Sequence, residues 1–198
     1  PFSLSNDQVR CLYADPEGSI WIGTQSAGVN IYFGSALKFE HYKHIEGSEN
    51  TLPGKGVFAI MQDADGLLWI GTDGGGLVSL DRKTGIYTSY PELLLSAKTK
   101  TVYSLLQDKD GLIWVGTNGG GVSTYDKKTK KVRYFMSEQN GMWSMVDNTI
   151  TNGTILSIVQ DKNGKIWIGT YGNDNTAGVF VYDKPTDSFT HISENEGL

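Results

Sequence analysis

The residues best suited to bind a ligand lie in two irregular segments of the chain. Residues 136–148 contain Trp143, and residues 171–177 contain Tyr171 followed by Asn173, Asp174 and Asn175. An indole offers a flat apolar face that can stack on the C–H bonds of a pyranose, and amide and carboxylate groups can hydrogen-bond to the surrounding hydroxyls. These residue types therefore favour an oligosaccharide as the ligand.

Residues with catalytic or metal-binding chemistry follow no known pattern. The sequence has no Gly-x-Ser-x-Gly elbow, no His-Glu-x-x-His motif and no paired catalytic carboxylates. His41 and His191 fall on separate predicted outer strands, with His44 just beyond the first, which favours solvated histidines over a metal cluster. We therefore expect a segment that is not an enzyme and that needs no metal or cofactor.

Composition excludes several classes of protein. The chain has 198 residues, of which 25 are glycine, 5 tryptophan and 10 tyrosine, and this mixture favours short strands joined by tight turns. A net charge of −5 provides no basic footprint for nucleic acid. No apolar run approaches the roughly 18 residues that a transmembrane helix needs, so we expect no membrane contact by this segment. The single cysteine, Cys11, rules out an internal disulfide.

The strongest signal is an internal repeat. Residues 9–24 align without a gap with residues 57–72, 102–117 and 155–170, and each copy contains one tryptophan, namely Trp21, Trp69, Trp114 and Trp167. Their spacings of 48, 45 and 53 residues are close to the period of propeller blades.

Each repeat unit resolves into four short strands. In the second unit, alternation and turn residues predict strands at 57–62, 68–72, 77–80 and after Gly85. The sequence Asp63-Ala64-Asp65-Gly66 predicts a tight hairpin whose carboxylates cap turn amides; it resembles a calcium loop only faintly, because further ligands are missing. Glycine triplets such as 74–76 are read as turns, since no phosphate-loop residues follow them.

A four-stranded sheet with two apolar faces must stack on its neighbours, which is the principle of a β-propeller. The sequence thus predicts an all-β segment of four four-stranded antiparallel blades, at about 1–48, 49–95, 96–148 and 149–198. The recurrent tryptophan would fill the space between blades, and the glycine two residues later would let the next blade approach. Cys11 aligns with three small residues and is expected to pack in the same way: Ala59, Ser104 and Ser157.

The string Asp-x-x-Gly-x-x-Trp-Ile-Gly-Thr, followed by Gly-Gly and Val or Leu, resembles the two-component regulator propeller repeat. The resemblance covers nearly the whole chain. It implies that the segment belongs to the periplasmic sensor region of a hybrid two-component system, as found in Bacteroidetes. The parent protein would be much longer, with further blades, a membrane helix, a histidine kinase and a DNA-binding output domain. It also implies that the ligand is an oligosaccharide.

The departures from the repeat predict where a ligand would bind. Loops between the second and third strands and connections between blades open on one face, and both irregular segments fall there. Gln25, Asp73 and Asn118 occupy the position just after the second strand and would line the same face. The alternative is that Trp143 merely plugs the mouth of the propeller.

The first and last blades are expected to contact partners. Unless four blades close into a small ring, the first and last blades each leave an apolar face uncovered, so we expect contact with further blades of the parent or oligomerisation. Two other functions remain open: a scaffold for dimerisation or protein binding, and an enzyme of the kind that some propeller lyases represent.

Overall fold

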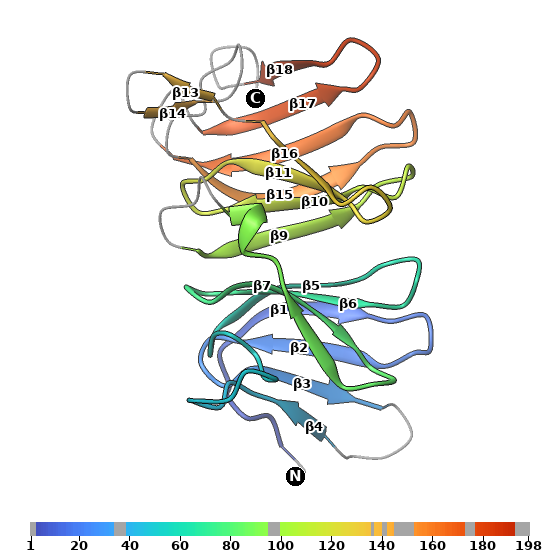
Figure 1. Cartoon of the computed structure of the whole chain (residues 1–198), viewed down its shortest axis with the longest axis vertical. Coiled ribbons are helices and arrows are strands. Elements are labelled where there is room, and N and C mark those ends of the chain that lie inside the picture. Colours follow the sequence, from blue (N-terminus) through green and yellow to red (C-terminus); the bar gives the residue numbers. More distant parts are fainter. Residues whose placement is uncertain are drawn as a thin grey trace. The chain divides into compact units, whose positions relative to one another are not determined.

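The computed structural model describes residues 3–33, 39–94, 100–135, 153–172 and 177–192, together with the course of the chain at 137–139 and 142–144. Among these residues Figure 1 shows strands nearly throughout, with a single short 3₁₀ helix, η1 (Pro91–Leu94). Within the described residues, the strands form four antiparallel four-stranded sheets and one two-stranded sheet. The predicted all-β architecture of four four-stranded sheets is therefore confirmed.

The strands of each four-stranded sheet follow one another in chain order. Blade 1 consists of β1 (Val9–Ala14), β2 (Ile20–Thr24), β3 (Val29–Tyr32) and β4 (Phe39–Tyr42). Blade 2 consists of β5 (Val57–Gln62), β6 (Leu68–Thr72), β7 (Gly76–Asp81) and β8 (Ile86–Ser89). Blade 3 consists of β9 (Val102–Gln107), β10 (Ile113–Thr117), β11 (Val122–Asp126) and β12 (Lys131–Tyr134).

Blade 4 consists of β15 (Thr154–Gln160), β16 (Ile166–Tyr171), β17 (Gly178–Asp183) and β18 (Ser188–Ile192). A hairpin of β13 (Ser137–Gln139) and β14 (Met142–Ser144) lies within the long connection that precedes it. The chain divides into two compact units, the first formed by Pro1–Pro91 with Lys100–Val102 and the second by Glu92–Thr99 with Tyr103–Leu198.

The hairpin between the first two strands of a blade depends on aspartate and glycine, as predicted. In blade 2 the backbone N–H of Asp63 donates to the carbonyl of Leu67, and Gly66 adopts a φ of +86° that favours glycine. The Asp63 carboxylate accepts hydrogen bonds from the backbone N–H groups of Asp65 and Leu67 at 2.9 and 3.0 Å. One side chain therefore holds the whole turn.

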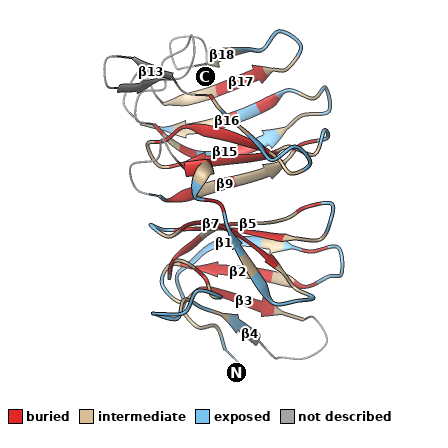
Figure 2. Ribbon diagram, viewed as in Figure 1, coloured by how far each residue is buried: buried red, intermediate tan, exposed pale blue. Residues whose placement is uncertain are grey.

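Face-to-face stacking of blades builds the core of each unit. In the first unit β1 lies against β5, and in the second β10 lies against β15. The buried set of the first unit is Trp21, Val29, Ile31, Leu52, Val57, Leu68, Ile70, Val78 and Leu80. That of the second is Trp114, Val122, Phe135, Ile155, Ile158, Ile166, Ile168, Phe180 and Tyr182. Figure 2 shows the buried inner strands, while the outer strands β4, β8 and β18 remain partly exposed.

The glycine in the second strand permits this close approach. A Cβ placed on Gly116 would lie 2.5 Å from Cγ2 of Ile155 in blade 4 and would also collide with Ser104. In the first unit, a Cβ on Gly23 would lie 2.9 Å from the carbonyl oxygen of Val57. The predicted role of this glycine is therefore confirmed.

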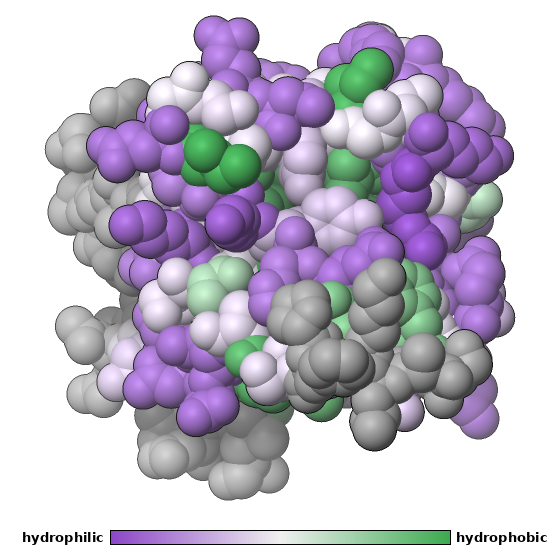
Figure 3. Space-filling view, turned by 90° about the horizontal axis from the view of Figure 1, so that it is seen from below, coloured by the Kyte–Doolittle hydropathy of each residue, from purple (hydrophilic) through white to green (hydrophobic). Residues whose placement is uncertain are grey.

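Trp21, Trp69 and Trp114 are at most 1% exposed, as predicted. Trp167, in contrast, is 37% exposed, and Val159 of the same blade is 57% exposed, because no sheet among the described residues covers that face of blade 4. Trp167 therefore does not fill a space between blades of the described residues, and it lies instead on the face that the last blade was expected to leave uncovered. Blade 1 likewise exposes Val9 and Leu12. Figure 3 shows separate hydrophobic groups among hydrophilic ones on one face of the protein.

Candidate ligand-binding face

The predicted residues Gln25 and Asp73 follow the second strands of their blades and flank one glycine. The backbone N–H of Asp73 donates to the carbonyl of Gly56 at 3.0 Å, and a Cβ placed on Gly56 would lie 2.6 Å from the carbonyl oxygen of Gln25. Gln25 Oε1 accepts a hydrogen bond from Nε of Arg10. The structure therefore brings Gln25 and Asp73 to opposite sides of the connection that enters β5.

In the second unit, Asn118 and Tyr171 have an equivalent arrangement around Thr154. Thr154 pairs with Tyr171 in the β15–β16 ladder and forms an isolated bridge with Asn118. The Thr154 hydroxyl also donates to Oδ1 of Asn118 at 2.8 Å. Tyr171 is 71% exposed, and it shares Thr154 as a backbone partner with Asn118.

Two of these polar residues connect successive segments rather than standing free. Asp73 Oδ1 accepts a hydrogen bond from the Thr101 hydroxyl at 3.0 Å, which matches the contact between Asn118 and Thr154. The Thr101 hydroxyl also accepts the backbone N–H of Gly74 at 3.0 Å. Asp73 and Asn118 therefore tie the end of a second strand to the start of the next first strand, at Thr101 just before β9 and at Thr154, the first residue of β15.

Other predicted residues cannot be placed. Trp143 lies in β14, where its backbone pairs with that of Glu138, but its side chain lies outside the described part of the structure. Asn173, Asp174 and Asn175 also lie outside the described residues. Their contribution to a binding site stays a prediction.

At the turn between the first and second strands of each blade, the repeated aspartate accepts a hydrogen bond from the repeated tryptophan. This contact was not predicted from the sequence. The indole N–H donates to the carboxylate in every blade: Trp21 to Asp15 at 2.9 Å, Trp69 to Asp63 at 2.8 Å, Trp114 to Asp108 at 2.6 Å and Trp167 to Asp161 at 3.1 Å. The constant spacing of six residues between Asp and Trp in all four repeats is the sequence feature from which this hydrogen bond could have been predicted.

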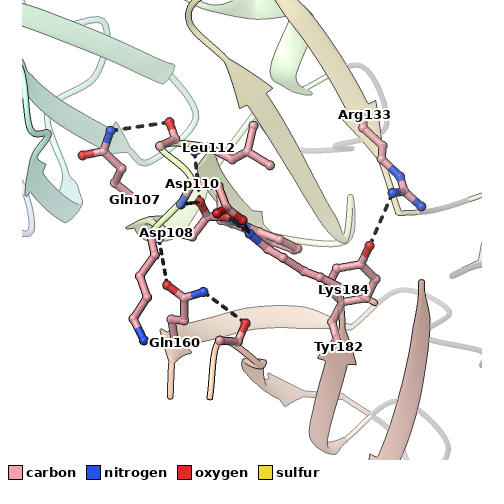
Figure 4. Close-up of polar contacts among 12 residues, drawn as sticks. Gln107, Asp108, Asp110, Leu112, Arg133, Gln160, Tyr182 and Lys184 are labelled. Atoms are coloured by element: carbon pink, nitrogen blue, oxygen red, sulfur yellow. Dashed lines mark hydrogen bonds and ion pairs between the residues drawn. The ribbon is translucent and has the colours of Figure 1, made fainter. Parts of the chain in front are cut away.

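A cation from the following blade completes this contact inside each unit. Lys184 donates to Oδ2 of Asp108 at 2.8 Å and also contacts Asp110, as Figure 4 shows. In the first unit, Nη1 of Arg82 lies 3.3 Å from Oδ2 of Asp15. These carboxylate oxygens are occupied by hydrogen-bond donors, which argues for a structural role rather than for catalysis or calcium binding.

The environment of Asp108 also changes its pKa. Burial raises the pKa of this carboxyl, but hydrogen bonds from Lys184 and from the indole of Trp114 outweigh it, so that the pKa lies below its ordinary value. The pKa of Asp15 is lowered in the same way, burial being outweighed by the Trp21 and Ser19 hydrogen bonds and by Arg82. Both groups therefore remain ionised and serve as fixed acceptors.

The histidines differ in part from expectation. His191 lies on β18 as predicted, but its ring stacks on Phe180 with centroids 4.2 Å apart and bonds to the Ala177 carbonyl, because these residues meet across the β17–β18 hairpin. The expectation of a solvated His191 is therefore wrong. His41 is exposed on β4, whereas His44 is half-buried. Within the described residues, no group of three His, Cys, Asp or Glu could hold a metal ion.

Cys11 is packed rather than reactive. Its thiol lies 3.7 Å from the carbonyl oxygen of Val57, and burial raises its pKa to about 12. The predicted packing role is supported by this environment, since a thiol with so high a pKa is a poor nucleophile.

The repeat in the sequence also matches a known protein family. A family model described as two component regulator propeller matches residues 3–26, 51–74, 97–119 and 149–172, which contain the first two strands of each blade. The chain carries four two-component regulator propeller repeats. The predicted resemblance is therefore confirmed. A comparison with curated proteins finds no match.

Solved structures share the fold of this propeller segment. An extracellular domain assigned to a hybrid two-component system of B. thetaiotaomicron has a TM-score of 0.76 and 26% identity, over 95% of this chain and 24% of that one. A second such domain from the same organism has a TM-score of 0.73 and 23% identity, over 96% and 23%. Virginiamycin B lyase from Staphylococcus aureus has a TM-score of 0.66 and 15% identity, over 94% and 55%.

These comparisons place the chain among propellers with two-component regulator repeats. The segment spans about a quarter of the length of the two extracellular domains. The likeness to the lyase, at 15% identity, extends to the fold alone. No helix among the described residues is long and apolar enough to cross a membrane.

Proposed function

We propose that this segment belongs to the periplasmic sensor region of a hybrid two-component histidine kinase and that it recognises an oligosaccharide. The observation that carries the proposal is the 26% identity over 95% of the chain with an extracellular domain assigned to such a system. The repeated blade edge that presents Gln25, Asp73, Asn118 and Tyr171 supports it. The segment itself is proposed to be non-catalytic.

Tyr171, which is exposed, and Asn118, which shares Thr154 as a partner with it, have chemistry that suits a sugar. The phenol ring offers a face for stacking on pyranose C–H bonds, and the amide can hydrogen-bond to hydroxyls. The proposed site also includes Trp143 and the residues between Tyr171 and Ala177. Binding would drive a signal only if the ligand had different affinities for two arrangements of the parent protein.

Thermal unfolding of the intact protein with a panel of neutral, uronate and sulfated oligosaccharides tests the proposal. A ligand at about 100 times its Kd stabilises the folded state by about 2.7 kcal/mol, which shifts the melting temperature measurably. We expect Tyr171→Ala to abolish the shift. The control Ile86→Ala removes an exposed side chain from β8 of the other unit and should leave it unchanged. The absence of any shift across the panel would refute the sensing function.

A second function, as an interaction scaffold, is favoured by the exposed hydrophobic residues of the end blades, namely Val9, Leu12, Val159 and Trp167. Such residues suit a face that is covered by further blades or by another copy. If Trp143→Ala left the response to sugar intact but abolished self-association, the scaffold would be the better description of the segment.

A further inference from the structure

A basic cleft opens on blade 1, at the strand ends that carry Gln25. Its volume is about 280 Å³. It forms where the loop between β2 and β3 meets the connection from β4 to β5. The lining residues, which define the basic cleft, are Ser5, Ser26, Ala27, Gly28, His41, Lys43, His44 and Lys55.

The charge of the basic cleft is opposite to that of the whole chain. Two lysines and two histidines line it, and none of its lining residues is acidic, although the chain has a net charge of −5. Local cations around a concave surface raise the local concentration of anions. The positive charge of the basic cleft is therefore local and does not follow from a generally basic surface. It favours an anionic ligand.

The two lysines are available for such a ligand. In the part of the chain that the structure describes, no carboxylate pairs with Lys43 or Lys55, and both side chains are exposed. The cations at the blade edges are different, since Arg82 and Lys184 are held by aspartates. An ammonium group without a carboxylate partner can bind an incoming anion without first breaking an ion pair.

The backbone around the basic cleft is fixed before any ligand arrives. The N–H of Gly28 donates to the carbonyl of Lys55 at 2.9 Å, which joins the loop to the connection. Gly28 has a φ of +77°, and any Cβ there would collide with the carbonyl of Tyr42. The Ser5 hydroxyl donates to the Ala27 carbonyl at 3.3 Å and accepts from Asn30 at 2.8 Å. Binding would therefore cost little ordering of the backbone.

His44 is oriented by one backbone contact. Its Nδ1 lies 2.6 Å from the carbonyl oxygen of Leu52. A carbonyl oxygen only accepts hydrogen bonds, so Nδ1 carries the proton and donates. This contact holds the half-buried ring in one orientation at the wall of the basic cleft.

From these observations we infer that the basic cleft binds the anionic group of an acidic saccharide, a carboxylate or a sulfate ester. This inference rests on the proposed function, because it specifies the class of sugar that the sensor recognises. Lys43 and Lys55 contact the anion, and the Ser26 hydroxyl and His41 hydrogen-bond to it or to the adjoining ring hydroxyls. A volume of about 280 Å³ is just below the range of roughly 300–1,000 Å³ that is usual for ligand pockets, and it suits a single sugar unit.

Calorimetric titration of the intact protein tests this inference with four probes: neutral galacto-oligosaccharides, oligogalacturonates, sulfated galacto-oligosaccharides and inorganic sulfate. We expect at least one acidic saccharide to bind at least tenfold more tightly than the neutral one. Its affinity should fall several-fold when sodium chloride rises from about 50 to 500 mM, because salt screens exposed charges. Comparison of the oligogalacturonates with the sulfated galacto-oligosaccharides shows whether a carboxylate or a sulfate ester is preferred.

A matched pair of double variants locates the site. Lys43→Gln with Lys55→Gln should reduce binding of the acidic saccharide at least tenfold. Lys128→Gln with Lys131→Gln makes the same change in net charge at two exposed lysines of blade 3 and should leave binding within twofold. An equal loss of affinity in both double variants would overturn the assignment, because net charge alone would then explain the effect.

The remaining outcomes separate this inference from the proposed function. If the neutral and acidic saccharides bind equally, or only the neutral one binds, the inference fails and the sensing function stands. If no saccharide binds, both fail, whether or not inorganic sulfate binds. If inorganic sulfate binds as tightly as the acidic saccharide, the basic cleft is an anion site without saccharide selectivity and the inference is overturned.

Discussion

The backbone N–H of Lys109 lies 2.8 Å from Oε1 of Gln160 and donates a hydrogen bond that joins blade 3 to blade 4. In blade 1 the equivalent position is Pro16, which has no N–H, and the equivalent acceptor in blade 2 is Gln62. Oε1 of Gln62 is buried and has no hydrogen-bond partner. One proline thus accounts for an unsatisfied acceptor between the blades of the first unit.

This difference predicts unequal effects for the same substitution at two repeat positions. Gln160→Leu leaves the Lys109 N–H without its acceptor and should lower the free energy of unfolding by about 0.5–1.5 kcal/mol. Gln62→Leu removes a buried acceptor that has no partner, together with the long Nε2 hydrogen bond of 3.4 Å to the Gly66 carbonyl, and should be nearly neutral. Urea denaturation of both variants measures the difference. Equal destabilisation by the two substitutions would contradict this explanation.

The glycine of the second strand gives a second matched pair. Gly116→Ala would place a methyl group against Ile155 and Ser104, and overpacking of this kind costs about 1–3 kcal/mol. Gly169→Ala meets only the side chain of Ser157, which can rotate, so we expect a loss of less than about 1 kcal/mol. The same denaturation experiment compares them, and a larger loss at Gly169 would count against blade stacking as the reason for this glycine.

The buried aspartates predict loss of stability in acid. The pKa of Asp15 and that of Asp108 are lower in the folded protein than ordinary carboxyl values. Their contribution to stability is therefore complete above the unfolded pKa of about 3.9 and is lost as the pH falls below it through the folded values. Melting temperatures measured between pH 2 and 7 should fall most steeply below about pH 4.

Asp108→Asn tests the source of that dependence. The amide presents only one oxygen where the carboxylate accepts from the indole, two backbone N–H groups and Lys184, so we expect a loss of about 2–3 kcal/mol at pH 7 and a shallower acid transition. Asp7→Asn, at an exposed carboxylate just before β1, serves as the control. An unchanged acid transition in Asp108→Asn would assign the loss to other carboxyls.

The exposed hydrophobic residues of blade 4 predict association. Val159 and Ile86 are each 57% exposed, but Val159 lies on the first strand of blade 4 and Ile86 on an outer strand. If the face of blade 4 is covered in solution, Val159→Asp should weaken association measured by light scattering and Ile86→Asp should not. A monodisperse monomer of the unchanged protein would contradict the prediction.

Much of the fold follows from local chemistry that the sequence displays. Asp63 and Gly66 specify a hairpin, and a glycine two residues after each tryptophan anticipates the contact between Gly116 and Ile155. The hydrogen bond from Trp114 to Asp108 was not predicted, because it depends on how the strands place the indole over the turn. His191 was misjudged because its burial depends on Phe180 in the neighbouring strand. The basic cleft was missed for a similar reason, since Lys43 and Lys55 meet Ser26 only when a loop and a connection come together.

Hydrogen–deuterium exchange of the intact protein, with and without the oligosaccharide that stabilises it, tests the sensing claim most directly. Backbone amides at 25–28 and 43–56 in the first unit, or at 171–177 in the second, should exchange more slowly with ligand, because these segments carry the binding face proposed for each unit. The aspartate turns at 15–18, 63–66, 108–111 and 161–164 should be unaffected. Protection confined to those turns, or no protection anywhere, would contradict a ligand-sensing role for this face.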